Sequence, residues 1–235
     1  MKLLEQIDDS IWLAKGEMVN FYGFSYPTRS VIVRLTSGDI WVWSPVKLRP
    51  ELRAELDRLG PIRHLVSPNK IHHLYLHEWK AAYPDAKIWG PESTIRKRPD
   101  LHFGMPLGDI VPAEWQTDLD VAWFKGSFAM DEVVFYHRSS RTVIVADLIE
   151  AFGDEFLRKY WPGWRRWVAY LGGITAEDPR APLDWRLSFF NRKQARVART
   201  RMCGWPCARV IMAHGEWQRT GGDAYLRRAF SWLGP

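Results

Sequence analysis

Four side chains that can bind a metal ion follow apolar segments of the sequence. His72 and His73 lie shortly after one such segment, Asp147 ends a second and His214 ends a third. Each has an ordinary role when considered alone, because a histidine can cap a helix or donate a hydrogen bond and an aspartate can form a turn. Together they are a ligand set for zinc, iron or manganese. We therefore predict one divalent metal ion at these four residues, with zinc favoured.

The segments before these residues have the composition of β-strands, with β-branched and aromatic residues bounded by turn residues. The predicted strands are Ser30–Leu35, Ile40–Trp43, Ile62–Val66, Lys87–Trp89, Val121–Phe124, Val133–Tyr136, Thr142–Ala146 and Arg209–Ala213. Start and stop signals predict helices over Arg49–Leu59, His72–Ala82, Asp154–Leu171, Arg192–Met202 and Asp223–Leu233. This mixed order predicts a layered α/β fold with more than one sheet.

Ligands in layered α/β proteins gather beyond the carboxyl ends of strands, which is where the four candidate ligands are expected. The sequence contains no repeat, no low-complexity segment and no convincing linker, so we expect a single domain over residues 1–235. Its C-terminal part, residues 151–235, is rich in tryptophan and basic, with 15 Lys and Arg against 7 Asp and Glu. Such asymmetry is typical of an anionic partner or of a solvated face.

The composition places limits on the class of protein. The chain has 235 residues, 46% of them hydrophobic, which is enough for a packed core. No stretch approaches the roughly 18 apolar residues of a membrane span, and the N-terminus becomes acidic early, so we expect a cytoplasmic location. The two cysteines, Cys203 and Cys207, are expected to be ordinary thiols rather than part of a disulfide framework.

Short phrases of the sequence resemble an uncharacterised domain family at the margin of the metallo-β-lactamase superfamily. The resemblance covers the chain from about Ile11 to His214, and the superfamily relation depends on the order of the motifs. It implies a metallo-β-lactamase-like four-layer αββα sandwich. The phrases are Trp43-Ser44-Pro45-Val46, Ser67-Pro68-Asn69-Lys70 with His72-His73, and Ser140-Arg141-Thr142 leading to Ala146-Asp147-Leu148.

The first metal-binding motif of that superfamily, His-x-His-x-Asp-His, is only half preserved. Pro68 and Lys70 stand where its first two histidines belong, while His72 takes the aspartate position and His73 the last histidine position. The superfamily's next histidine falls on Ser127. The resemblance therefore implies that the ligands of one of the two metal sites are missing.

The second metal site retains competent ligands, which the resemblance places at His72, His73, Asp147 and His214. It implies a metal-dependent hydrolase of a small-molecule substrate that the sequence does not name, with anionic compounds among the candidates. In this reading Asp147 is catalytic as well as a ligand, because it orients the attacking water. Lys70 is the second catalytic candidate, since its ammonium would supply part of the missing ion's charge.

The alternative is a catalytically inactive scaffold that binds a ligand, a partner or a membrane surface, with the four residues as a buried hydrogen-bond cluster. Residues 156–171 are compatible with a peripheral membrane contact, because they have the composition of an interfacial helix divided by Pro162-Gly163, although such tryptophans more often form a core stripe. A core stripe of tryptophans with outward arginines has the same composition. The residues concerned are Trp161, Trp164, Trp167, Arg158, Lys159, Arg165 and Arg166.

Nucleic-acid binding is the least favoured interpretation. One predicted helix carries several cations near Trp205, three of them with the spacing of one helix face. However, the superfamily members that process nucleic acids keep the full two-metal motif, which this sequence lacks. The cations are Arg192, Lys193, Arg196, Arg199 and Arg201.

Overall fold

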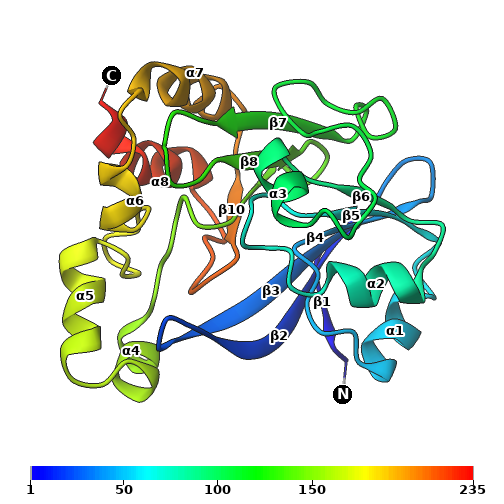
Figure 1. The fold of residues 1–235 in the computed structure, drawn as a ribbon, viewed down its shortest axis with the longest axis horizontal. Helices are drawn as coiled ribbons and strands as arrows, with labels where there is room; N and C mark the ends of the chain where they lie inside the picture. The colour runs from blue at the N-terminus through cyan, green and yellow to red at the C-terminus, as the bar shows by residue number, and fades with distance from the viewer. Residues whose placement is uncertain (1, 235) are drawn as a thin grey trace.

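Two β-sheets lie between two layers of helices (Figure 1). The computed structural model describes residues 2–234. Within them the first sheet has the strand order β1-β2-β3-β4-β5-β6 and the second the order β10-β9-β8-β7. The strands are β1 (Leu4–Asp8), β2 (Ile11–Phe21), β3 (Phe24–Arg34), β4 (Ile40–Trp43), β5 (Ile62–Val66), β6 (Lys87–Trp89), β7 (Leu119–Phe124), β8 (Glu132–His137), β9 (Thr142–Val145) and β10 (Arg209–Met212).

Helices cover the outer face of each sheet. The α-helices are α1 (Pro50–Leu56), α2 (Leu76–Ala82), α3 (Glu92–Lys97), α4 (Asp154–Tyr160), α5 (Trp164–Gly172), α6 (Leu183–Leu187), α7 (Arg192–Cys203) and α8 (Gly222–Ala229), followed by the 3-10 helix η1 (Ser231–Leu233). None of the described helices is both long and apolar enough to cross a bilayer. The layer order helix, sheet, sheet, helix confirms the predicted αββα sandwich.

Successive side chains of a strand point to opposite faces of the sheet, and this alternation produces the layers. In β4, Ile40 and Val42 pack with residues of α1 and α2, whereas Trp41 and Trp43 pack in the core between the sheets. All four side chains are fully buried, because both faces of this sheet are covered. The continuous apolar sequence of β4 is therefore explained by its position in the sandwich.

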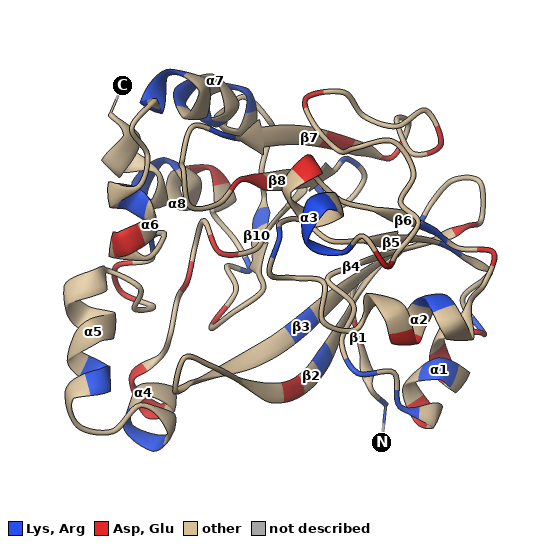
Figure 2. Ribbon diagram, viewed as in Figure 1, with Lys and Arg blue, Asp and Glu red and all other residues tan. Residues whose placement is uncertain are grey.

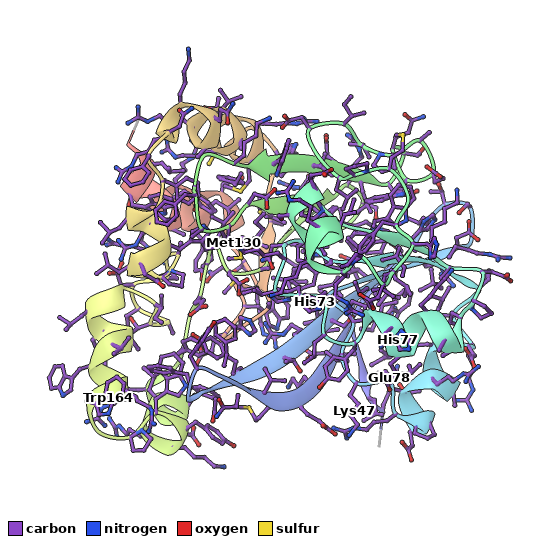
Figure 3. All side chains as sticks on the ribbon, in the orientation of Figure 1. Lys47, His73, His77, Glu78, Met130 and Trp164 are labelled. Carbon is purple, nitrogen blue, oxygen red and sulfur yellow. The ribbon has the colours of Figure 1, made fainter. Side chains whose placement is uncertain are left out.

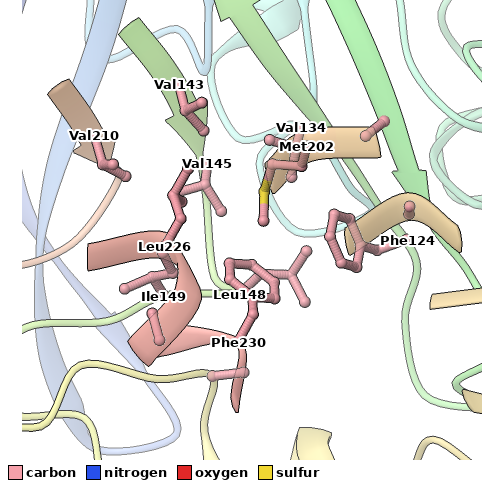
Figure 4. Packing of buried hydrophobic residues seen from close by; sticks show 14 of the residues in the cluster. Phe124, Val134, Val143, Val145, Leu148, Ile149, Met202, Val210, Leu226 and Phe230 are labelled. Carbon is pink, nitrogen blue, oxygen red and sulfur yellow. The ribbon is translucent and has the colours of Figure 1, made fainter. Parts of the chain in front are cut away.

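The second sheet follows the same rule. Val143 and Val145 of β9 pack against Met202 of α7 and Leu226 of α8 (Figure 4). Ile144 faces the other way, into the core between the sheets. Side chains of alternating direction thus build one core between the sheets and one under each helical layer.

The parallel strands bring their carboxyl ends to common edges. Strands β4, β5 and β6 are parallel to one another in the first sheet, and β9 and β10 are parallel in the second. The segments after β4, β5, β9 and β10 carry the polar residues described below. The topology therefore gathers residues that are far apart in the sequence.

The predicted start of the second helix, at His72, is wrong. Residues 70–75 form turns, and α2 begins at Leu76 instead of His72. The side chain of Asn69 explains the difference, because its Oδ1 accepts hydrogen bonds from the backbone N–H groups of Ile71 and His72. An asparagine side chain that binds the backbone in this way competes with helix formation.

Other differences lie at the ends and between elements. Strands β1 and β2 and helices α3 and α6 were not predicted, and β3 begins six residues earlier than expected, at Phe24. The interruption at Pro162-Gly163 is confirmed, since α4 ends before it and α5 begins after it. The predicted last helix divides into α8 and η1.

Candidate metal centre

Three side chains meet where the two sheets face each other. Nε2 of His72 lies 3.1 Å from Oδ2 of Asp147, and Nε2 of His214 lies 3.2 Å from Oδ1 of the same carboxylate. The side chains are 5–9% exposed. His72 comes from the turn after β5, Asp147 from the end of β9 and His214 from the end of β10. The strand ends thus bring these three residues together.

The geometry of this group fits a metal ion. One ligand atom from each of the three residues lies within 4.8 Å of the others. Zinc binds imidazole nitrogen and carboxylate oxygen at about 2.0–2.2 Å, which separates neighbouring ligand atoms by about 3.4 Å in a tetrahedral site. Two imidazoles and one carboxylate form the ligand set of a catalytic metal site, which keeps further positions open.

Hydrogen bonds to the far nitrogens orient both imidazoles. Nδ1 of His214 lies 2.7 Å from the backbone carbonyl of Pro27 and must carry a proton, because a carbonyl only accepts. Nε2 of the neutral ring then presents a lone pair toward Asp147, so a cation must separate the two: a second proton on the ring or a metal ion. Nδ1 of His72 lies 2.6 Å from Oγ of Ser44. Such partners fix metal-binding histidines.

The amide of Asn69 holds the other side of the group. Its Nδ2 donates to Oδ2 of Asp147 at 2.8 Å and to Oε2 of Glu132 at 2.9 Å. Its Oδ1 fixes the turn that carries His72, as described above. Because Asn69 is fully buried, this single side chain connects the turn after β5 to the second sheet.

Glu132 is a buried acidic residue at the first position of β8. Its oxygens accept hydrogen bonds from the backbone N–H groups of Ala146 (2.8 Å) and Asp147 (2.9 Å) as well as from Asn69. Burial and the charge of Asp147 raise the pKa of Glu132 to about 8. Burial alone would raise the pKa of Asp147 too, but His72 and His214 outweigh it and hold that pKa well below its usual range.

A third buried carboxyl group interacts with the other two. Glu150 is 3% exposed, and burial together with the charges of Asp147, Asp184 and Glu132 raises its pKa. Among residues 2–234 its Oε2 has no hydrogen-bond partner. Several carboxyl groups that disfavour one another's ionisation create an environment in which a bound cation is stabilising.

The turn that carries His214 is fixed by a glycine and an arginine. Gly215 has a φ of +80°, and a Cβ atom there would lie 2.1 Å from the carbonyl oxygen of Ala151. Arg29 of β3 donates to the carbonyls of Met212 and Gly215, and burial lowers its pKa to about 10. His214 therefore has little freedom to turn away from the centre.

His73 does not join the group, contrary to the sequence prediction. Its Nδ1 and its carbonyl both lie 3.1 Å from a guanidinium nitrogen of Arg98, and it stands beside the start of α2 (Figure 3). Burial, then the charges of Lys97 and Arg98, lowers the pKa of His73 to about 4. In the turn that Asn69 stabilises, His72 and His73 have different partners. His73 lies next to the guanidinium group of Arg98.

Lys70, the second predicted catalytic residue, is half-buried in the same turn. Within the described part of the chain its ammonium has no hydrogen bond and no ion pair.

The basic residues of α7 differ, because Arg192, Arg196 and Arg199 donate to backbone carbonyls of residues 232–234. Those three guanidinium groups already have partners within the chain.

Sequence reasoning missed several residues of the centre. Ser44 and Asn69 belong to the phrases that carried the family resemblance, but their contacts with the ligand residues were not inferred. Glu132 had a signal too, since it is an acidic residue directly before a run of apolar strand residues. Pro27 contributes only a backbone carbonyl, for which a sequence has no signal.

The fold is that of the metallo-β-lactamases. The chain is similar to a metallo-β-lactamase from Pontibacter korlensis (TM-score 0.58, 15% identity, 98% of this chain and 97% of that chain). It is also similar to the metallo-β-lactamase DIM-1 (TM-score 0.64, 13% identity, 98% and 95%) and to FIM-1 from Pseudomonas aeruginosa in its mono-zinc form (TM-score 0.61, 14% identity, 99% and 96%). At these identities the likeness establishes the fold alone.

The family is that of a domain without an assigned activity. Residues 8–156, more than half of the chain, match the family described as domain of unknown function DUF4336. The chain belongs to this family, which confirms the resemblance seen in the sequence. A comparison with curated proteins found no match.

Proposed function

We propose that this protein binds one divalent metal ion through His72, Asp147 and His214 and hydrolyses a small-molecule substrate with it. The observation that carries the proposal is the pair of Nε2 atoms facing the two oxygens of one buried carboxylate. A divalent ion in such a site lowers the pKa of bound water toward about 7 and polarises a carbonyl or phosphoryl oxygen. Zinc is the favoured ion, with iron or manganese as alternatives.

The charge of the ligand set supports a reactive ion. Two neutral imidazoles and one carboxylate leave a divalent ion with a formal charge of +1. Asn69 and Glu132 support the carboxylate, because Asn69 donates to Asp147 and Glu132 accepts the N–H of Asp147. We propose that Asp147, besides binding the ion, orients the water that attacks the substrate.

Three features support a site with a single ion. The resemblance places Pro68, Lys70 and Ser127 where two-metal members of the superfamily carry histidines, and none of the three is a zinc ligand of the usual kind. Oγ of Ser127 also lies 2.6 Å from Oγ of Ser188, so this hydroxyl has another partner. A related fold has been obtained in a mono-zinc form, that of FIM-1.

Hydrolysis is tested with the metal-loaded full chain and a panel of esters, thioesters, lactams and phosphate esters. We expect cleavage that a chelator removes, that zinc restores, and that Asp147→Asn lowers at least 100-fold. The control is His73→Ala, which changes a neighbouring histidine and should retain the activity. Equal activity of Asp147→Asn and the unchanged protein would refute the hydrolytic mechanism.

Lys70 is proposed to bind an anionic group of the substrate. Its ammonium is half-buried and unpaired within residues 2–234. Lys70→Met should abolish the binding of phosphate or a carboxylate inhibitor to the metal-loaded protein and leave the metal content unchanged, as measured by calorimetry and elemental analysis. Lys70→Arg keeps the charge and should retain at least part of the affinity. Undiminished anion binding by Lys70→Met contradicts this role.

A second candidate is the inactive scaffold, and one observation favours it. The two Nε2–oxygen distances are also hydrogen-bond distances, so a doubly protonated histidine would complete the cluster without a metal. A purified protein that binds no metal when metal is supplied in excess would support this candidate.

A further inference from the structure

The apolar stripe of α5 faces solvent instead of the core. Trp164, Trp167, Val168 and Leu171 have the i, i+3, i+4, i+7 spacing of one helix face and are 64%, 62%, 41% and 77% exposed. In a globular protein a stripe with this spacing normally packs inward. The buried residues of α5 are instead the small Ala169 and Gly172.

The tip of the β2–β3 hairpin extends this apolar surface. Tyr22 is 89% exposed and Phe21 is 44% exposed. Phe24 of the same hairpin contacts Trp164, with ring centroids 5.8 Å apart. The indole N–H of Trp161 donates to the carbonyl of Ser25 at 2.8 Å, which fixes the hairpin against the end of α4. We call α5 together with Phe21 and Tyr22 the α5 surface.

Residues 156–171 contain four Lys and Arg residues and no Asp or Glu (Figure 2), and Asp154, just before them, accepts a hydrogen bond from Tyr170 of α5. Arg158 forms an ion pair with Asp154. Lys159, Arg165 and Arg166 form no ion pair within the described residues. Unpaired cations beside exposed tryptophans can bind anionic headgroups while the indole rings enter the interface.

We propose that the α5 surface binds peripherally to an anionic lipid bilayer. Charge favours a lipid bilayer over a second copy of the chain as the partner of this surface. In a symmetric contact, Arg165 and Arg166 would face the same cations of the second copy. Tryptophan and tyrosine are the residues that favour the membrane interface, and the basic flank is complementary to anionic lipid. The surface needs no spanning segment for this role.

Co-sedimentation of the full chain with vesicles tests the proposal. We expect binding to vesicles that contain phosphatidylglycerol, with far weaker binding to vesicles of phosphatidylcholine alone. The double variant Trp164→Ala with Trp167→Ala should bind at least tenfold more weakly. Both side chains are exposed, so the variant should fold, which circular dichroism checks. Its matched control is Met105→Ser with Ile110→Ser, two side chains that are 74% and 83% exposed in another segment.

A second pair of variants separates specific docking from general attraction. Arg165→Gln with Arg166→Gln should lower binding to the anionic vesicles about tenfold or more. Arg227→Gln with Arg228→Gln removes the same charge from α8 and should have a much smaller effect. Equal losses in both pairs, or no binding to anionic vesicles at all, would overturn the proposal. So would a dimer in solution that only the tryptophan variant abolishes.

The test is independent of the metal centre. The protein should bind vesicles equally well with metal and after chelation, because the α5 surface contains none of the proposed ligands. A loss of binding on chelation contradicts a surface that acts on its own.

Discussion

The candidate metal centre and the α5 surface break the usual distribution of residues in opposite ways. The centre buries ionisable groups, among them Asp147 and Glu132, whereas the α5 surface exposes large apolar groups such as Trp164 and Leu171. A buried charge is costly without a partner, and an exposed apolar patch has no stabilising contact. Both departures are explained by a partner from outside the chain. We propose a metal ion as the partner of the centre and a lipid bilayer as the partner of the α5 surface.

The two regions are linked through one aromatic residue. The ring centroid of Tyr26 lies 5.0 Å from that of His214 and 5.4 Å from that of Trp161. Trp161 directly follows the last residue of α4. Burial, then the charge of Glu150, raises the pKa of Tyr26, so it remains a neutral phenol. The same buried cluster thus supports both His214 of the candidate centre and the base of the α5 surface.

The largest effect on stability is expected in the buried part of the centre. Glu132→Ala leaves the N–H groups of Ala146 and Asp147 and the amide of Asn69 without their acceptor. We expect a loss of about 3–5 kcal/mol in the free energy of unfolding, measured with urea. Glu132→Gln, the control, retains an acceptor oxygen and should lose less. A loss below about 1 kcal/mol for the alanine variant would show that the cluster is not supported as described.

Two tryptophans of one sequence segment sharpen the contrast between inside and outside. Trp161 is 1% exposed, and its replacement by alanine should cost about 3–5 kcal/mol of unfolding free energy. Trp167 is 62% exposed, and its replacement should change that free energy by no more than about 0.5 kcal/mol. Comparable losses in the two variants would place α5 against the core.

A histidine outside the centre gives a pH-dependent test. Burial lowers the pKa of His64 to about 4, and its Nδ1 accepts a hydrogen bond from the indole of Trp89 at 3.1 Å. The unfolded chain takes up this proton near pH 6.5, so His64 lowers the free energy of unfolding as the pH falls from about 6.5 to 4. The expected loss is on the order of 1–3 kcal/mol.

The measurement is the difference between the unchanged protein and His64→Gln in urea titrations at several pH values. The difference is needed because His73 acts with the same sign, whereas the raised pKa of Glu132 acts with the opposite sign in both proteins. The difference should fall by about 1–3 kcal/mol as the pH is lowered from about 7 to 4 and be constant above about pH 7. A flat difference over the whole range would contradict a neutral, buried His64.

The last of these predictions concerns the hydroxyl partner of His72. Ser44→Ala removes the hydroxyl that contacts its Nδ1 at 2.6 Å. We expect metal affinity to fall about 10- to 100-fold with little change in stability, as competition with a chelating dye would measure. Ser140→Ala is the control, because that serine contacts His137 instead. Unchanged affinity would mean that the orientation of His72 does not depend on Ser44.

The strand pattern predicts much of the fold. Runs such as Thr142–Val145 and Ile40–Trp43 appear as strands because buried sheets need continuous β-branched and aromatic residues. Strand β2 was not predicted, because its sequence contains Gly16 and charged residues. Its pairing with β3 is also irregular, with a shift between Lys15 and Met18. The early hairpin therefore has a weaker pattern than the core strands.

The grouping of His72, Asp147 and His214 also follows from their places after strands, but finer details do not. The separation of His73 depends on a turn that the side chain of Asn69 determines. Likewise, the spacing of Trp164 and Trp167 predicts an apolar stripe without stating whether it faces the core or solvent. Both outcomes depend on tertiary contacts that a local pattern does not contain.

The most direct test of the central claim is the metal content per chain. Elemental analysis after loading and dialysis should give one divalent ion per chain for the unchanged protein and for His73→Ala. His72→Ala and His214→Ala should each retain less than about a tenth of that amount. A protein without stoichiometric metal, or variants at positions 72 and 214 that retain it, would contradict the account.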